Sequence, residues 1–436
     1  PALLGVGFIV GPRVSSVLFS GAVLGWWLLV PLAIFLNPSL TQNLQPNQSM
    51  IDLAFDVWKN QVRPLAVGTM IVAAFYTLYG LRQSLIGGIQ KAFKDFSLKG
   101  GNDNEIERTE IDLNLKKVFI SIVILAIPMF ILYDYFSNSL GGSLVLTIIM
   151  IILGFLFAAV AGYLVGMIGS SNNPISGLTL STLLIAAILM VGLGVTGMKG
   201  VAAVLAIAGV ICCAAGIAGD MMQDLKVGHI LGGTPWRMQI AEIVGVICAA
   251  LVLAFPLAAL DKVYHIGSAE LPAPQAGLMA LMAKGIVGGQ MAWPLVIVGI
   301  FFAFGLILIN APSPMLIAVG MYLPFESTAA IFVGGLIKWW LEKNMEKRKA
   351  TAEEKTRAEN LGTLLSSGFI AGEALMAVIL AFWVLGRNLT TAIPGLPHIA
   401  NNFWISLLVY PALIYLLAYM PLKKMKEGGL PSTHVD

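Results

Sequence analysis

Apolar stretches of about 20 residues recur along the chain and alternate with shorter polar connections. This length allows an α-helix to cross a bilayer, whereas membrane β-strands would show alternating segments of about ten residues. By apolar length alone, about twelve segments are long enough to be embedded in a membrane. The pattern therefore predicts an all-α polytopic membrane protein in which residues 1–436 form a single transmembrane domain.

Three of the apolar stretches are interrupted by glycine, asparagine and proline, which break or kink helices. The interruptions are Gly11-Pro12, Asn172-Asn173-Pro174 and Asn310 to Pro314. Irregular backbone at membrane depth occurs where it is covered by protein or lines a cavity, and in secondary transporters it marks the substrate site. We therefore expect some helices to be broken or re-entrant.

The second and third interruptions resemble each other, because in each an asparagine precedes proline and a small or hydroxyl-rich apolar helix follows. Counting the segments places the two interruptions on opposite faces of the membrane. This arrangement favours an inverted repeat. Two ordinary surface turns are the alternative.

The composition, 58% hydrophobic and 11% charged, differs from that of soluble domains, which carry roughly a quarter charged residues. Lys and Arg gather in residues 90–117, in residues 341–360 and after residue 420. The positive-inside rule makes the first two regions cytoplasmic loops and places the C-terminus in the cytoplasm. The connections that then lie outside are poor in Lys and Arg, namely 37–60, 137–143, 261–275 and 386–401.

A polar passage, Gly219 to Gln239, lies between two apolar segments in the middle of the chain. The same count places this connecting loop on the cytoplasmic side. Asp220 and Asp224 are four residues apart, so on a helix they would share one face, with Lys226 off that face. We predict a cytoplasmic gate at the end of the permeation route. A capped amphipathic connector is the alternative.

Carboxylates within apolar runs are candidates for carrying protons, because ionisable residues inside membrane segments are rare and functional. Glu373 lies deep in an apolar run and is the first candidate. Glu326 follows a break at Pro324, and Glu242 lies near a helix start; these are the further candidates. For each carboxylate the alternative is a structural hydrogen bond between helices.

Residues at the breaks supply candidates for substrate binding. Arg13 stands beside the first break and Lys284 lies within a short apolar segment, so either cation could hold a carboxylate. Arg13 could instead lie at a helix end and reach the interface with its long side chain. The further candidates for the substrate pathway are Asn172, Asn173, Ser176, Asn310, Ser313 and Tyr322.

Several ordered motifs resemble the oligopeptide transporter (OPT) family, most of all its prokaryotic branch, which is close to the yellow-stripe-like transporters. The motifs are Gly11-Pro-Arg13, Asn173-Pro-Ile-Ser-Gly-Leu-Thr179, Gly219-Asp-Met-Met-Gln-Asp-Leu-Lys226 with Gly232 and Thr234-Pro235, and Ser313-Pro-Met-Leu-Ile-Ala-Val-Gly-Met-Tyr-Leu-Pro324 with Gly334-Gly335. Beyond Gly335 only the hydropathy matches. Family members are larger, so the resemblance implies that the first part of the transmembrane domain is missing from this chain.

The resemblance implies proton-coupled uptake. The peptide branch takes short peptides, and the yellow-stripe branch takes metal chelates such as iron bound to nicotianamine. We therefore expect a secondary active, proton-coupled transporter of small peptides, with uptake of metal–chelate complexes as the alternative. The expected location is the prokaryotic inner membrane, and the expected partners are substrate, protons and lipid, with an oligomer open. No cofactor, resident metal or nucleic acid is expected.

Other functional classes fit the sequence less well. Tyr133-Asp134, Ala218-Gly219-Asp220 and Pro411-Ala-Leu413 are superficially similar to intramembrane aspartyl proteases, which makes such a protease a remote alternative. However, the topology puts the two aspartates on opposite faces, about 30 Å apart. A passive channel fits the dispersed charges and broken helices less well than alternating access does. A Walker A motif is absent from the sequence, which disfavours an ATP-driven pump. We therefore do not expect an enzyme.

Overall fold

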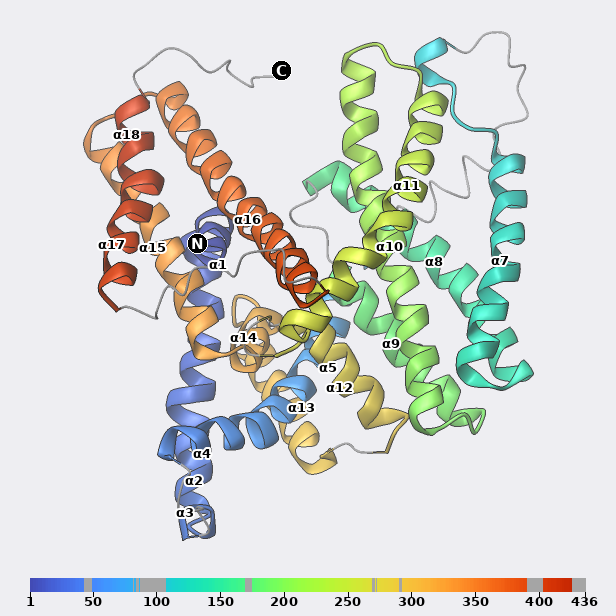
Figure 1. Ribbon diagram of the computed structural model, residues 1–436, viewed down its shortest axis with the longest axis horizontal. Coiled ribbons are helices and arrows are strands. Elements are labelled where there is room, and N and C mark those ends of the chain that lie inside the picture. Colours follow the sequence, from blue (N-terminus) through green and yellow to red (C-terminus); the bar gives the residue numbers. More distant parts are fainter. Residues whose placement is uncertain are drawn as a thin grey trace. The chain divides into compact units, whose positions relative to one another are not determined.

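The computed structural model describes residues 1–42, 49–80, 82–83, 86, 107–168, 175–268, 271, 273–289, 292–389 and 403–425. The regular elements in these ranges are all helices (Figure 1). Seven of them are long and apolar enough to cross a membrane, and the shorter helix α13 (Trp293–Leu308) is also apolar. The prediction of an all-α polytopic membrane protein is confirmed.

The chain forms two compact units. Unit 1 contains residues 1–70, 255–272 and 301–436, and unit 2 contains residues 71–254 and 273–300.

Unit 1 is built around helix α1 (Ala2–Ala22), which packs against α14 (Pro314–Tyr322), α15 (Phe325–Lys347) and α16 (Ala352–Leu389) (Figure 1). The other elements of this unit are η1 (Val23–Leu29), α2 (Val30–Leu36), α3 (Ser39–Gln42), α4 (Met50–Val57), η2 (Trp58–Val62), the start of α5 (Arg63–Gly80), α17 (Phe403–Ile414), η6 (Tyr415–Tyr419) and α18 (Met420–Lys424).

Glycines bring α1 into backbone contact with α14 and α15. A methyl group on Gly7 would overlap the carbonyl oxygen of Ile331, and one on Gly334 would overlap that of Leu4. At the other end of α1, a methyl group on Gly21 would overlap the carbonyl oxygen of Ile317. The partner positions fall as the α1 positions rise, so the helices run antiparallel. Close approach through small residues is typical of membrane helix pairs.

Two of the predicted helix breaks lie in unit 1, and the structure confirms both. Gly11 has φ 83° and ψ 174°, which interrupts α1 at the residue before Pro12. The Asn310 to Pro314 break separates α13 from α14, and Asn310 adopts a left-handed φ of 54°. The Asn172-Asn173-Pro174 break lies outside the described residues, so the inverted repeat stays a prediction.

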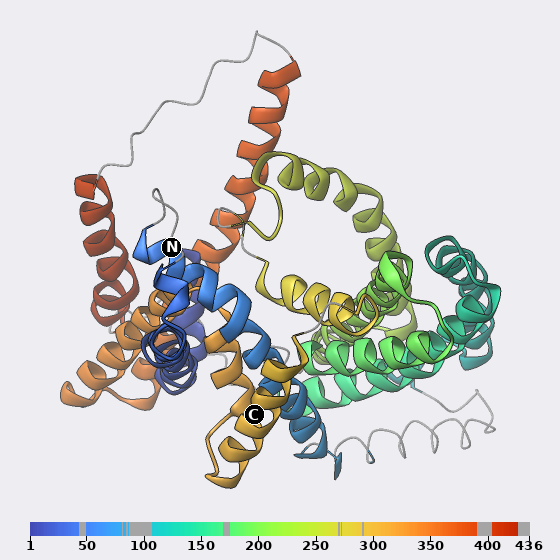
Figure 2. The same ribbon diagram turned by 90° about the horizontal axis from the view of Figure 1, so that it is seen from below.

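Unit 2 contains a group of long helices in which α10 packs against α8 and α9, and α7 packs against α8 and α10 (Figures 1 and 2). The buried side chains include Leu164, Leu183, Ile207 and Ile211. The helices are α7 (Leu115–Ser137), α8 (Leu140–Ile168), α9 (Ile175–Gly192), α10 (Gly197–Ile230), the first part of α11 (Pro235–Tyr264) and α12 (Pro274–Ile286).

The polar passage at 219–239 is mostly helical, which corrects the expectation of a loop. α10 continues to Ile230 and α11 begins at Pro235, so the connection is only Leu231 to Thr234. Gly232 makes the turn with φ 72°, a conformation that suits glycine. Polar residues at a helix end remain helical because water and neighbouring segments satisfy their side chains.

The segment before α7 holds this connection in place. The Arg108 guanidinium donates to the Gly232 carbonyl oxygen at 2.8 Å and to Thr234 Oγ1 at 3.0 Å. The Leu113 backbone N–H donates to Gln239 Oε1 at 2.9 Å. The α10–α11 connection is therefore tied to the start of α7.

The charged region 341–360 is also largely helical, because α15 continues to Lys347 and α16 begins at Ala352. Thr351 and Glu354 form a reciprocal capping pair at the start of α16, with N–O distances of 2.9 and 3.3 Å. The predicted cytoplasmic loop therefore reduces to a short turn, while its side assignment stays a prediction.

The carboxyl group of Glu342, in the charged end of α15, has a pKa above its ordinary value of 4.5. Burial is the main cause; Lys338 opposes the shift, and Glu359 and Glu346 add to it. The stability contributed by Glu342 is thus greatest below its ordinary pKa and is lost as pH rises through the folded-state pKa. We expect Glu342→Gln to raise the thermal unfolding midpoint at pH 8 but not at pH 4. An equal shift at both pH values would contradict this.

Candidate functional site

The candidate residues from the sequence divide between the two units. Unit 1 holds Arg13, Asn310, Ser313, Tyr322, Glu326 and Glu373. Unit 2 holds Ser176, Asp220, Asp224, Lys226, Glu242 and Lys284. Asn172 and Asn173 lie outside the described residues.

In unit 2 the structure brings three predicted carboxylates together at the α10–α11 connection. Glu242 of α11 interacts electrostatically with Asp224 and Asp220 of α10. A proposed proton carrier and two proposed gate residues therefore share one acidic cluster. Lys226 is exposed beside it, and Ser176 and Lys284 are exposed elsewhere in the unit.

In unit 1 the most elaborate polar arrangement lies at Leu323-Pro324, the break between α14 and α15. The last carbonyl groups of α14 accept hydrogen bonds from two tryptophans. Trp58 Nε1 donates to the Met321 oxygen at 3.0 Å, and Trp26 Nε1 donates to the Leu323 oxygen at 3.3 Å. The broken end of α14 is thus satisfied by indole groups rather than by water.

Both tryptophans stand in π-helical turns, which are rare and often lie at functional sites. Trp26 belongs to η1 and Trp58 to η2. Their rings stack with centroids 4.9 Å apart, and Phe55 meets Trp26 edge-on at 5.0 Å. Two π-turns and one helix break therefore meet at the same place in unit 1.

Arg63, directly after η2, completes this arrangement. Its Nη2 donates to the hydroxyl of Tyr322, the last residue of α14. The guanidinium carbon lies 4.2 Å from the Tyr322 ring centroid and 5.3 Å from that of Trp58. Tyr322 is 3% exposed and Arg63 is half-buried. We call Trp26, Phe55, Trp58, Arg63 and Tyr322 the break cluster.

Sequence reasoning identified Tyr322 but missed the other four members of the break cluster. The available signal was Arg63-Pro64 at the start of an apolar run, a cation next to a helix-breaking residue. The same criterion singled out Arg13, which the structure leaves exposed.

The remaining candidates near the breaks have local structural roles. Ser313 caps α14 by accepting a hydrogen bond from the Leu316 backbone N–H at 3.4 Å. Glu326 is exposed in the first turn of α15, where a negative charge complements the helix dipole. Asn310 is exposed in the turn before α14.

Glu373 lines an open pocket of about 530 Å³ in unit 1. Its Oε2 atom accepts a hydrogen bond from the Ala2 backbone N–H at 2.8 Å, so the carboxylate caps α1. The rest of the pocket wall is largely apolar, with Tyr264, Leu271, Phe369 and Met376 among its residues. Glu373 therefore combines the predicted interhelical hydrogen bond with access to a cavity.

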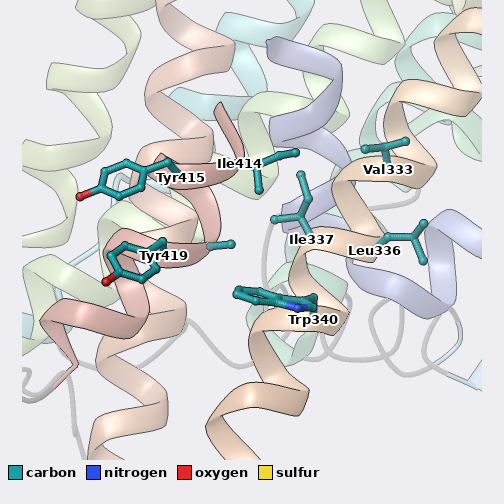
Figure 3. A pocket seen from close by; sticks show the side chains of 8 residues that line it. Val333, Leu336, Ile337, Trp340, Ile414, Tyr415 and Tyr419 are labelled. Carbon is teal, nitrogen blue, oxygen red and sulfur yellow. The ribbon is translucent and has the colours of Figure 1, made fainter. Parts of the chain in front are cut away.

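A second groove, of about 280 Å³, runs between α15 and η6. Figure 3 shows Trp340 on one side and Tyr415 and Tyr419 on the other, and the two tyrosine rings stack at 5.2 Å. Its other side chains, such as Val333 and Ile337, are aliphatic. A groove with so few polar atoms suits an apolar occupant and matches a charged solute poorly.

The geometry of unit 2 also bears on the two aspartates of the protease alternative. Residues 112 and 113, just before α7, bond to Gln239 in the first turns of α11. Asp134 lies about 30 Å further along α7, near its other end. Asp220 instead interacts electrostatically with Glu242, which lies in the first turns of α11. The two carboxyl groups therefore cannot share a proton.

Comparison with known proteins gives one family. A family model described as OPT oligopeptide transporter protein matches residues 1–384. A Haemophilus influenzae protein whose name assigns it to oligopeptide transport is 31% identical over 470 residues, which is 98% of this chain and 73% of that protein. No solved structure gives a significant match.

More distant relatives include transporters of plants and yeast. A metal-nicotianamine transporter of Arabidopsis thaliana is 26% identical over 222 residues, covering 47% of this chain and 31% of that protein. A Saccharomyces cerevisiae protein named for oligopeptide transport is 27% identical over 179 residues, covering 37% of this chain and 24% of that protein.

Proposed function

Since the chain belongs to the oligopeptide transporter family, we propose that it is a secondary active, proton-coupled transporter of small peptides. The family match over residues 1–384 and the name of the Haemophilus influenzae relative support this proposal. The location that we propose is a prokaryotic inner membrane, with the C-terminus in the cytoplasm. The distribution of Lys and Arg supports this orientation.

The observation that carries the proposal is the pair of interrupted helices in unit 1. α1 is broken at Gly11. α14 and α15 together run antiparallel to α1, and the break between them lies at Leu323-Pro324. Discontinuous membrane helices of this kind expose helix ends to substrates in secondary transporters. A peptide carries both a carboxylate and an amine, and helix ends with nearby charged side chains suit both groups.

Uptake of metal–chelate complexes is the second candidate. It is favoured by the similarity to the Arabidopsis thaliana metal-nicotianamine transporter. Such chelates carry several carboxylates and amines, so they would use the same kinds of contacts as peptides do.

We propose different roles for the charged groups of the two units. Glu373 carries the coupled proton, because it is a carboxylate in an apolar helix with access to a pocket. Glu326 is the second candidate for this role. Asp220 and Asp224, with Lys226, form the gate, and Glu242 is the third proton candidate. Repulsion between Glu242 and the two aspartates depends on the separation of α10 and α11.

Uptake into liposomes by the full-length protein tests the function. With an inward proton gradient, we expect saturable accumulation of a labelled tripeptide together with acidification of the lumen. A metal–nicotianamine complex, tested in parallel, distinguishes the second candidate. Gradient-independent equilibration of either compound would indicate a passive channel and overturn the proposal.

The gate assignment predicts the effect of Asp220→Asn. Removing one charge from the acidic cluster should change the opening equilibrium, so the maximal uptake rate should fall while half-saturation stays unchanged. Asp261→Asn, near the other end of α11, is the matched control. Unchanged uptake by a well-folded Asp220→Asn variant would favour a simple connector.

A further inference from the structure

We propose that Arg63 binds a carboxylate group of the transported substrate at the break between α14 and α15. This assignment rests on the proposed transport function and names a residue that recognises the substrate. Four features of the break cluster lead to it: the spare hydrogen-bond donors of Arg63, the satisfied end of α14, the rigid aromatic support and the uncapped start of α15.

The guanidinium group has donors to spare. Arginine carries five N–H donors, and the described residues engage Arg63 through one hydrogen bond, to the Tyr322 hydroxyl. Its Nε atom is buried without a hydrogen-bond partner among these residues. The described part of the chain also gives Arg63 no acidic partner. An arginine held at a helix break with an unused donor and no counter-ion suits an incoming anion.

A purely structural role as a helix cap does not account for Arg63. Cations commonly stabilise a helix C-terminus by binding its last carbonyl groups. At the end of α14, however, the Met321 and Leu323 carbonyl groups already accept hydrogen bonds from Trp58 and Trp26. The charge of Arg63 is therefore left available for another partner.

The aromatic side chains hold the guanidinium group in a fixed orientation. It lies against the rings of Tyr322 and Trp58, and Trp58 is itself stacked on Trp26. A planar guanidinium held in this way can offer two parallel N–H groups to a carboxylate. Because Arg63 is half-buried, its charge is less screened than at the surface.

The start of α15 lies at the same break, where the exposed carboxylate of Glu326 in the first turn also faces the helix dipole. This helix begins at Phe325, directly after the break, and its N-cap residue Pro324 provides no side-chain hydrogen bond. The first N–H groups of a helix carry a partial positive charge and bind anions. By contrast, Arg13 and Lys284, the cations expected from the sequence, are exposed and lack such surroundings.

The test compares a tripeptide that has a free C-terminal carboxylate with the same tripeptide as its C-terminal amide. Binding to the full-length protein is measured by the ligand-induced shift in thermal unfolding, and uptake is measured in liposomes. We expect the wild-type protein to bind the acid roughly 10- to 100-fold more tightly than the amide. Arg63→Gln should bring this ratio close to one, and Arg63→Lys should give an intermediate ratio.

Arg82→Gln is the matched control, because Arg82 also stacks on a tyrosine, 4.2 Å from the Tyr79 ring centroid, but is exposed. Its acid-to-amide ratio should equal that of the wild-type protein. Tyr322→Phe keeps the aromatic ring and removes the fixed hydrogen bond, so it should lower the ratio less than Arg63→Gln does. This variant also tests the proposal if Arg63→Gln fails to fold.

The outcomes separate this inference from the proposed function. Carboxylate-dependent binding through Arg63 without any uptake would overturn transport and support the Arg63 site. Uptake with equal affinity for acid and amide, or an unchanged ratio in Arg63→Gln, would overturn the Arg63 site and leave transport standing. Binding of neither compound would also overturn it, unless a metal–nicotianamine complex binds in an Arg63-dependent way, which would identify a chelate as the source of the carboxylate.

Discussion

Gly334→Leu is expected to prevent stable packing of α1 against α15. Even the first carbon of the new side chain would overlap the carbonyl oxygen of Leu4, and it would also crowd the backbone of Gly7. Backbone atoms cannot move aside as a flexible side chain can, so the two helices must separate. We expect a loss of stability at or beyond the upper end of the roughly 1–3 kcal/mol that overpacking usually costs.

Size-exclusion profiles and thermal unfolding of the detergent-solubilised protein measure this effect. Gly305→Leu, in α13, is the matched control, because the described residues leave open space around that glycine. The control should be recovered in normal yield and unfold close to the wild-type midpoint. A Gly334→Leu protein as stable as this control would show that α1 and α15 are not packed as described.

Glu373→Gln is expected to abolish proton-driven accumulation while leaving exchange of substrate across the membrane intact. Glutamine can still accept the hydrogen bond from the Ala2 backbone N–H, so the cap of α1 should survive. It cannot take up or release a proton, so accumulation should fall to the level of liposomes without protein. Counterflow of labelled substrate against unlabelled substrate should continue.

Glu353→Gln is the matched control for this loss of coupling. Glu353 lies on the same helix, α16, and forms an exposed pair with Arg357 at 3.5 Å. Exposed pairs of this kind contribute little, so accumulation should be unchanged. If Glu373→Gln accumulates substrate as the wild-type protein does, the coupled proton is carried elsewhere and Glu326 becomes the first candidate.

The features of the fold that the sequence predicted correctly depend on residues close together in the chain. Apolar length predicts membrane helices because every backbone hydrogen bond must be satisfied inside the helix. The break at Gly11 follows from glycine and proline alone, and Ser313 caps α14 through an N–H three residues later. The glycine pairs Gly7-Gly11 and Gly21-Gly25, each four residues apart, are a further local signal for close helix packing.

The break cluster could not be predicted because it joins segments far apart in the chain. Trp58 bonds to the backbone of Met321, and Arg63 bonds to Tyr322. No local pattern indicates which helix end a tryptophan will meet, and π-helical turns have no clear sequence signature. The extent of α10 was missed for a different reason, because polar residues beyond the bilayer can continue a helix as well as end it.

The antiparallel contact between α1 and α15 has a consequence for synthesis of the protein. α1 is made before α15, and its partner Gly334 follows more than 300 residues later, which takes roughly 15 to 60 s at about 5–20 residues per second. During this interval the glycine face of α1 lacks the partner against which it finally packs. A chaperone or insertase that shields this face would therefore act before the C-terminal third has left the ribosome.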